Sequence, residues 1–223
     1  MGLSRKIHRS PGSRRPMLTP EAVVEAAARV LARDGYAGLT MRAIADDLGV
    51  QAPALYWYFG DKRALELALF EHLMEGFSVS VSGDDWRDQL RRGAQQLRAY
   101  LGGLRDIVRL DPQGFWVGPN SLSQLDAVLG ILTSAGLSPH DAANAVSMLN
   151  SFVFQWAGAE ADFSAERAEF LTSAARVPPD PARYPNVAAA REFLLRWDPD
   201  GNFAFRLDAM IAGLMARIRS DRV

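Results

Sequence analysis

The feature that most limits how this chain can fold is the spacing of its apolar residues, which return every three to four positions along almost its whole length. The first such segment places five apolar residues on one helical face: Val23, Val24, Ala27, Val30 and Leu31. A strand buried on one side needs strict alternation instead, and no alternating segment of useful length occurs. The sequence therefore predicts an all-α fold.

Capping residues mark helix boundaries in the N-terminal third. Thr19, Thr40 and Asp61 stand where a side chain can cap the first turn of a helix. Gly35 and Gly49 stand where helices end. Short helices joined by a tight glycine turn are typical of a helix-turn-helix unit. After the first helix, the expected elements are a second helix over 41–48, a third over 51–59 and a longer fourth helix after residue 61.

The pattern changes to longer helices beyond residue 83. Four prolines between 178 and 185 indicate an irregular connection between two of these helices. This second part has about 140 residues, enough for a hydrophobic core of its own. The predicted helices cover residues 85–102, 104–110, 121–135, 139–162, 186–197 and 203–220.

Composition removes several classes of function. The 223 residues include no cysteine and only three scattered histidines, which argues against disulfides, thiolate metal sites, cysteine nucleophiles and histidine metal clusters. No phosphate-binding glycine loop or nucleophile elbow occurs, and the segment 198–209 lacks the glycine and glutamate of a calcium loop. We therefore expect neither an enzyme nor a cofactor or metal. Without a membrane span or signal core, a cytoplasmic protein is expected.

The charge is unevenly distributed along the chain. Residues 1–18 carry five basic residues and no acid, whereas the rest of the chain holds 20 basic and 26 acidic residues. A basic arm on an acidic body suits a polyanion that binds at one end of the molecule. A solvated tail without a partner is the alternative.

Residues 56–59 form a run of four aromatic side chains, Tyr-Trp-Tyr-Phe. At 100° per residue the four cannot all face a core. Leu55 and Phe59, four positions apart, can face inward, which leaves Tyr56, Trp57 and Tyr58 at least partly exposed. Exposed aromatics on a short helix behind a basic arm suit contacts with the phosphates and thymine methyls of a DNA major groove. A protein-interaction patch is the alternative.

The segment 39–65 closely resembles the DNA-binding domain of the TetR family of transcriptional repressors. Gly49, the run 55–59 and the following 61–65 stand where that family has its turn, its recognition helix and the start of its fourth helix. The resemblance covers most of residues 19–219, more loosely in the second part. Similarity to the ligand-binding domain of Tet repressors is found in residues 85–88, 136–138 and 205–214.

The resemblance implies a basic flexible arm over 1–18, a three-helix helix-turn-helix DNA-binding domain over 19–66, and a larger helical ligand-binding and dimerisation domain over 67–223. It implies a homodimer with two further partners, a double-stranded DNA operator and a small-molecule effector. The expected function is that of a repressor released from a palindromic operator. Ligand binding is expected to shift residues 104–118 and so pivot the fourth helix. The alternatives are a regulator without a ligand response and an activator.

Roles in DNA binding follow from the resemblance position by position. It implies that Arg42, Tyr56 and Lys62 contact backbone phosphates. Ala52 and Ala54 replace polar residues of the Tet repressor, so its hydrogen bonds to bases cannot be repeated and the operator should differ. The residues implied to meet base edges and groove shape are Ala52, Pro53, Ala54, Trp57 and Tyr58.

Two apolar helix faces predict the dimer interface. They lie on the helices over 139–162 and 203–220, and the family resemblance implies that two copies of each form a four-helix bundle. The alternative is that both helices bury these faces within one chain. The predicted interface residues are Phe152, Trp156, Leu207, Ile211, Leu214 and Ile218.

Apolar and aromatic residues beyond the needs of these helices predict an effector pocket with a few polar anchors, and ordinary core residues are the alternative. The ligand-binding set of the Tet repressor is absent, because Glu75, Gly93, Leu97 and Asp111 stand at the matching positions. We therefore expect a bulky, largely apolar effector, such as an antibiotic or biosynthetic intermediate, instead of a tetracycline–magnesium complex. The candidate pocket residues are Leu97, Tyr100, Asp111, Phe115, Trp116, Met148, Asn150, Ser151 and Phe154.

Overall fold

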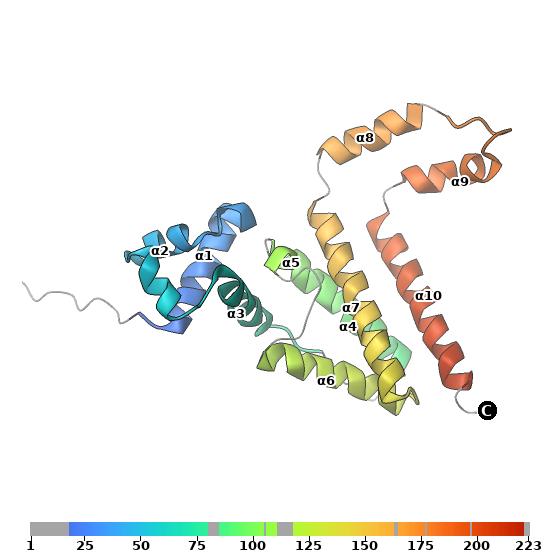
Figure 1. The fold of residues 1–223 in the computed structure, drawn as a ribbon. Coiled ribbons are helices and arrows are strands. Elements are labelled where there is room, and N and C mark those ends of the chain that lie inside the picture. Colours follow the sequence, from blue (N-terminus) through green and yellow to red (C-terminus); the bar gives the residue numbers. More distant parts are fainter. Residues whose placement is uncertain are drawn as a thin grey trace, which may run out of the picture.

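The computed structural model describes residues 18–79, 85–104, 106–110, 118–162, 165–176, 178–196 and 198–220, and every regular element in these ranges is a helix (Figure 1). The predicted all-α fold is therefore confirmed. The N-terminal elements are α1 (Pro20–Gly38), α2 (Met41–Leu48), the 3-10 helix η1 (Ala52–Trp57) and α3 (Lys62–Met74). The later elements are α4 (Trp86–Gly102), α5 (Ile107–Leu110), α6 (Pro119–Ser134), α7 (Pro139–Ala161), α8 (Ala165–Arg176), α9 (Pro185–Leu195) and α10 (Pro199–Ser220).

The predicted helix caps are formed. The side chains of Thr19, Thr40 and Asp61 accept hydrogen bonds from backbone N–H groups in the first turns of α1, α2 and α3, at 3.2, 3.1 and 2.7 Å. Gly49 ends α2 in the left-handed region, at φ 67°. Gly35, at φ 72°, interrupts α1, but helical turns resume after it. The helix end expected at Gly35 is therefore a kink.

The elements α1, α2, η1 and α3 form one unit, which we call the head. Apolar side chains from all four meet in its core, among them Val23, Val30, Ile44, Leu55 and Leu65, each at most 2% exposed. α1 packs against both α2 and α3, and α2 packs against η1. This core decides which side of η1 turns toward solvent.

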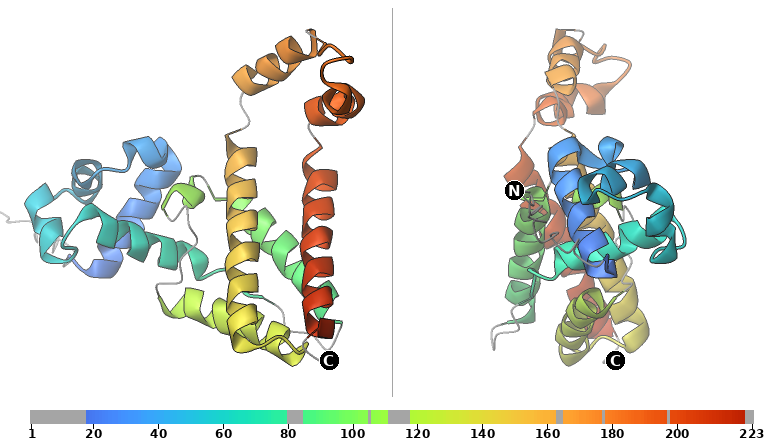
Figure 2. Two further views of the ribbon diagram at one scale, coloured as in Figure 1. Left: turned by 45° about the vertical axis from the view of Figure 1, so that its right-hand side comes forward. Right: turned by 90° about the vertical axis from the view of Figure 1, so that its left-hand side faces the viewer.

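The second unit, the body, consists of α4–α7 and α10 and is built around α7. Helix α7 packs against α4, α5, α6 and α10, and α7 and α10 run side by side (Figure 2). Its core includes Leu97, Leu132, Val153, Leu207 and Ile211. Within the described ranges, no helix combines the length and apolar character needed to cross a membrane.

Helices α8 and α9 lie beyond the ends of α7 and α10 and pack against each other (Figure 1). Helix α9 agrees with the helix predicted over 186–197, whereas α8 is not predicted. The reason is that α8 carries only two large apolar residues, the neighbours Phe170 and Leu171, which give no helical period. The irregular connection indicated by the prolines is the segment between α8 and α9.

Helix α3 belongs to the head core and also attaches the head to the body. The guanidinium of Arg63 donates a hydrogen bond to the backbone carbonyl of Leu110 in α5. From α1, the backbone N–H of Tyr36 donates to Oδ2 of Asp106, just before α5, at 2.8 Å. The head is therefore joined to the body through polar contacts to α5 as well as through the chain itself.

Candidate DNA-binding surface and effector cavity

The aromatic run is divided between the head core and solvent. Leu55 is fully buried, whereas the exposed fractions of Tyr56, Trp57 and Tyr58 are 50%, 89% and 41%. Phe59 is partly buried against the core. The predicted exposure of three of the four aromatics is therefore confirmed, with Trp57 the most exposed.

Element η1 is a 3-10 helix over Ala52–Trp57, shorter and tighter than the helix predicted over 51–59. Residues three apart share a face in this geometry. Ala52 and Leu55 accordingly turn to the core together, while Pro53 is exposed and Ala54 partly buried. Of the three small residues predicted to meet base edges, Pro53 is thus the exposed one.

The two predicted phosphate-binding cations differ in their surroundings. The side chain of Arg42, on α2, is 89% exposed, and its Nε lies 4.0 Å from Oδ2 of Asp46, a long and weak pair. The Nζ of Lys62 lies 3.2 Å from Oε1 of the buried Glu66 and 4.9 Å from the centre of the Tyr36 ring. Arg42 can therefore offer its whole guanidinium to a phosphate, whereas the charge of Lys62 is partly paired with Glu66.

Two further arginines of the head are held by an acid. Arg29 and Arg33 donate to the carboxylate of Asp47 at 2.8 and 3.1 Å. These hydrogen bonds, that of Arg29 foremost, hold the pKa of Asp47 below its usual value. Because their charges are already paired, these arginines are poorer candidates for phosphate contacts than Arg42 is.

Tyr58 ties the start of α1 to the aromatic run. Its hydroxyl donates a hydrogen bond to the backbone carbonyl of Leu18 at 2.7 Å. Leu18 follows directly on the basic segment 1–17, which lies outside the described residues. The attachment point of the predicted basic arm is therefore beside η1.

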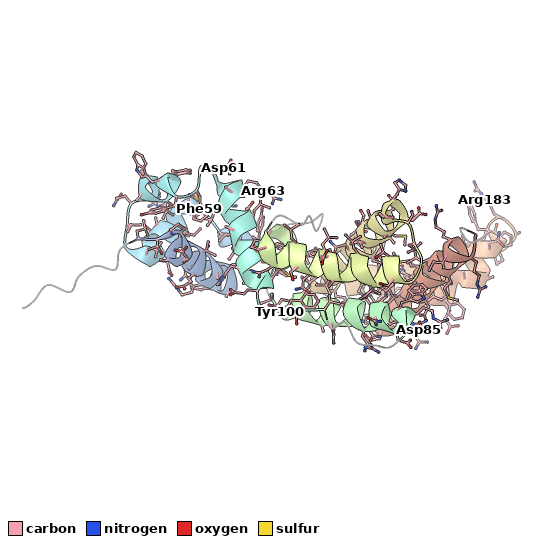
Figure 3. All side chains as sticks on the ribbon, turned by 90° about the horizontal axis from the view of Figure 1, so that it is seen from below. Phe59, Asp61, Arg63, Asp85, Tyr100 and Arg183 are labelled. Carbon is pink, nitrogen blue, oxygen red and sulfur yellow. The ribbon has the colours of Figure 1, made fainter. Side chains whose placement is uncertain are left out.

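The structure gathers the predicted DNA-contact residues in one part of the head. They lie on α2, on η1 and at the junction of η1 with α3, and α2 packs against η1. Figure 3 shows Phe59, Asp61 and Arg63 at this end of the molecule, Tyr100 where the head meets the body, and Asp85 near the far end of the body. Helix α2 lies on the side of the head away from the body (Figure 1), and η1 packs against it.

The body contains a cavity of about 60 Å³ between α4, α6 and α7. Apolar side chains from all three helices line it, including Leu97, Val128 and Leu149. Phe77 and Val79, from the segment after α3, close one side. None of the described residues that line it carries a charge. The cavity therefore suits an uncharged molecule.

Three buried amides supply the polar groups of this cavity. Gln89, Gln124 and Asn150 line it, and their exposed fractions are only 9%, 9% and 5%. Oε1 of Gln124 accepts a hydrogen bond from the backbone N–H of Val79 at 2.6 Å. An amide offers both donors and an acceptor, so these side chains can orient a ligand that carries carbonyl or hydroxyl groups.

The predicted effector residues are only partly brought together. Leu97 and Asn150 line the cavity. Asp111, Phe115 and Trp116 lie outside the described residues. Four predicted residues do not line the cavity: Tyr100, Met148, Ser151 and Phe154.

These four have other surroundings because a helix turns by 100° at each residue. The hydroxyl of Tyr100 donates to the backbone carbonyl of Leu73 at 2.6 Å, at the end of α3. The ring of Phe154 packs against Phe70 of α3, with centroids 6.0 Å apart. Met148 is 41% exposed and faces a groove between α7 and α10. Ser151, the neighbour of a cavity-lining residue, is likewise rotated off the cavity face of α7.

The sequence analysis missed Gln89 and Gln124. A polar residue on an apolar helix face was the available signal: Gln89, Gly93 and Leu97 follow one another at four-residue steps along α4. On α6, Gln124 shares a face with Val128. In both helices the glutamine lies on the apolar face, and this position indicates that its amide is buried.

Most residues of the predicted dimer seam are buried within the chain. Leu207, Ile211, Leu214 and Ile218 are each at most 8% exposed, because this face of α10 packs on α4 and α7 of the same chain. Trp156 is also buried, at 6%. Within one chain this stripe is part of the hydrophobic core.

The opposite face of α7 and α10 is open. Phe205 is 75% exposed, and a groove of about 590 Å³ runs between the two helices, lined by Met148, Met210 and Gly213 among others. Phe152, at the edge of this face, is partly buried and stacks on Phe203 with ring centres 4.9 Å apart. The groove adjoins the predicted seam, because Leu214 also lines it.

Comparisons with known proteins match both units. Residues 23–69 match the family described as "Bacterial regulatory proteins, tetR family", and residues 81–218 match "Tetracyclin repressor-like, C-terminal domain". The class C tetracycline repressor protein of Escherichia coli is 35% identical over 204 residues, which cover 88% of this chain and 90% of that protein. The HTH-type transcriptional repressor DrrR1 of Streptomyces coeruleorubidus is 28% identical over 220 residues, covering 93% and 81%.

Solved structures agree in shape. Apo ActR from Streptomyces coelicolor superposes with a TM-score of 0.83 at 25% identity, over 90% of this chain and 98% of ActR. ActR in complex with actinorhodin superposes with a TM-score of 0.81, also at 25% identity and with the same coverage. Together these matches span the head and the body. The chain therefore belongs to the tetR family of bacterial transcriptional regulators, which are DNA-binding proteins and not enzymes.

Proposed function

We propose that this chain is a repressor that binds a palindromic DNA operator as a homodimer and leaves it when a small molecule enters the body. The main observation in favour of DNA binding is that the aromatic run is exposed, and Trp57 is the most exposed of its residues, at 89%. Grouped exposed aromatics mark an interaction surface. The similarity to the class C tetracycline repressor makes DNA the partner.

In this proposal Arg42, Tyr56 and Lys62 bind backbone phosphates and thereby set the register of the head on the duplex. The small and aromatic side chains of η1, with Tyr58, contact base edges and thymine methyl groups. The basic segment 1–17, attached beside Tyr58, adds phosphate contacts. Because these contacts release counterions, operator affinity should fall steeply as salt rises.

The dimer interface of the proposal is the open face of α7 and α10. Gly213 and Ala209 on α10 line its groove and leave room for a second helix to approach closely. Phe205 and Met148 supply exposed apolar surface on the same two helices. A two-fold interface needs one self-complementary patch, and two antiparallel copies of this helix pair provide it.

The proposed effector is an electrically neutral, largely apolar compound with carbonyl or hydroxyl groups. It binds the cavity between α4, α6 and α7, where every lining residue that the structure describes is uncharged. A charged group buried there would lose its hydration without gaining a counter-charge. The amides of Gln89, Gln124 and Asn150 supply hydrogen bonds instead. The complex of the related ActR with actinorhodin supports a small-molecule response in this fold.

The proposed domains are a basic arm over 1–18, a DNA-binding domain over 19–66 and a ligand-binding and dimerisation domain over 67–223. The boundary at residue 66 falls inside α3, which spans Lys62–Met74. The two domains therefore share one helix. A displacement of α3 by the body is a displacement of the head.

The DNA-binding half is tested by selecting duplexes from a random-sequence pool with the full chain. Enriched duplexes should contain an inverted repeat that binds two copies of the protein. The control is Trp57→Ala, which should enrich the repeat weakly. A pool without enrichment, or equal enrichment by the variant, would contradict the proposal.

The ligand-binding half is tested with matched pairs of polycyclic aromatic compounds that differ by one carboxylate. Neutral members should raise the thermal unfolding temperature of the full chain and lower its affinity for the selected operator. A consistent preference for the carboxylates would contradict the effector class. Stabilising compounds that leave operator binding unchanged would favour the alternative, a regulator without a ligand response.

A further inference from the structure

The N-terminal end of α6 is held by a side chain from α3. The carboxylate of Glu71 accepts a hydrogen bond from the backbone N–H of Ser121 at 2.6 Å and another from its hydroxyl at 3.1 Å. Ser121 is fully buried. A carboxylate at a helix N-terminus meets free N–H groups and the positive end of the helix dipole, so this is a strong contact. We call it the Glu71 clamp.

The local backbone is suited to the clamp. Gly118, the residue before α6, offers no side-chain cap of its own. A Cβ atom at Gly118 would lie 2.2 Å from Oε2 of Glu71, so a larger residue would push the carboxylate away. The side-chain amide of Asn120 also donates to the backbone carbonyl of Glu71, at 3.4 Å. Gly118, Asn120 and Ser121, at the start of α6, therefore all lie against Glu71 of α3.

The other part of the same helix is a wall of the cavity. Gln124, Val128 and Ile131 line the cavity and follow Ser121 at steps of three, four and three residues. This spacing places the clamp and the cavity wall on one face of α6. A push on the wall is therefore also a push on the helix end that Glu71 holds.

The size of the cavity makes such a push necessary. A cavity of roughly 150 Å³ holds one benzene ring, whereas the cavity described above measures about 60 Å³. A compound with several rings can enter only if a wall moves. Two of the cavity walls are bound to α3, the helix shared with the head: α4 through the hydroxyl of Tyr100, and α6 through the backbone and side chain of Ser121 at its N-terminal end.

We propose that Glu71 is a positioning residue that transmits effector binding to the head: the effector displaces α6, and the clamp moves α3 with it. This inference rests on the proposed function. Two other contacts fix α3 to the body but bypass the cavity wall on α6. They are the hydrogen bond of Tyr100 to Leu73, from α4, and that of Arg63 to Leu110, from α5.

The test needs no identified ligand, because a side chain can imitate one. Val128→Trp adds volume from α6 into the cavity, and we expect it to weaken binding to the selected operator by tenfold or more. The same substitution is then made in a Glu71→Ala background. There the expected loss is threefold or less, because the displaced α6 no longer moves α3.

Two further backgrounds separate transmission from general stability. Tyr100→Phe removes another buried hydrogen bond to α3, from α4, and should leave the tenfold effect of Val128→Trp intact. Glu71→Gln keeps an acceptor oxygen for Ser121 and should restore part of the effect. A merely structural role for Glu71 would make the Ala and Phe backgrounds behave alike.

Each outcome has one meaning. If Val128→Trp weakens operator binding equally with and without Glu71, the clamp is not the route, and the inference is wrong. If Val128→Trp does not weaken binding in the wild-type chain, displacement of α6 is not the signal. Should Val128→Trp fail to fold by circular dichroism, Gly93→Phe, which fills the cavity from α4, replaces it with the same expectations. A wild-type chain that selects no operator contradicts the proposed function instead.

Discussion

The head and the cavity of the body each place side chains against their usual preference, in opposite directions. At η1, large aromatic side chains that could stabilise a core are turned out to solvent. In the cavity, amides that could face solvent are turned inward, with Asn150 only 5% exposed. Both arrangements cost folding free energy, which is why we propose both as binding surfaces. The difference is that the first can be seen in a run of four residues, whereas the second depends on how three helices are rotated.

The largest expected effect tests the inward side of η1. Leu55→Ala removes a fully buried side chain from the head core, and we expect it to lower the free energy of unfolding by about 2–5 kcal/mol. Urea denaturation followed by circular dichroism measures this. A loss below about 1 kcal/mol would show that η1 is not packed as described.

Two residues further along, Trp57→Ala tests the outward side. Since Trp57 is 89% exposed, its loss should change the free energy of unfolding by no more than about 0.5 kcal/mol. Operator binding should weaken by about 1–3 kcal/mol, the usual value of a good base contact. Titration of a labelled operator measures the change. Unaltered operator affinity would favour the protein-interaction patch.

A smaller effect is expected at Gln124, in the cavity. Gln124→Met preserves the volume but removes the acceptor that Val79 N–H uses at 2.6 Å. Leaving that donor unpaired should cost about 1 kcal/mol or slightly more. Hydrogen exchange should accelerate at the Val79 amide while the amides of α1 keep their protection. Unchanged exchange at Val79 would mean that Gln124 serves only as cavity lining.

The smallest effect concerns Asp85, which caps α4. Hydrogen bonds from the side chain and then the backbone N–H of Arg87 lower the pKa of Asp85 to about 2. Because the folded-state pKa is depressed, the stabilisation is complete above the unfolded value near 4 and disappears as the pH falls toward 2. The thermal midpoints of the wild type and Asp85→Asn should therefore differ at pH 6 and converge near pH 2. A constant difference would contradict this cap.

The head could largely be predicted from the sequence because its signals are local. Thr19, Thr40 and Asp61 each act within one helical turn, and each forms the expected cap. The exposure of Trp57 could be predicted because four consecutive aromatic residues in one short element cannot all face the core. Two features of the head were not predicted, the 3-10 form of η1 and the continuation of α1 after Gly35, because both depend on packing between elements.

The body was harder to predict because an apolar face on a helix does not indicate which other helix packs against it. The stripe through Leu207 and Ile211 was correctly seen as apolar, but the sequence could not say whether α4 and α7 or a second chain covers it. The surroundings of the candidate effector residues could not be predicted for the same reason: Tyr100 and Phe154 contact α3 and do not line the cavity. The partners of these residues are set by helix rotation, which the helical period leaves undetermined.

The length of α3 has a mechanical consequence. Its 13 residues form a rod about 20 Å long, with Glu71 near one end and Lys62 at the other. Such a rod acts as a lever: a tilt of roughly 5° about one end moves the other by about 1.7 Å, more than the whole distance range of a hydrogen bond. In the proposed mechanism the signal depends on the stiffness of α3 and not on a large movement, so a substitution that makes α3 more flexible should abolish the response to the effector without changing either binding surface.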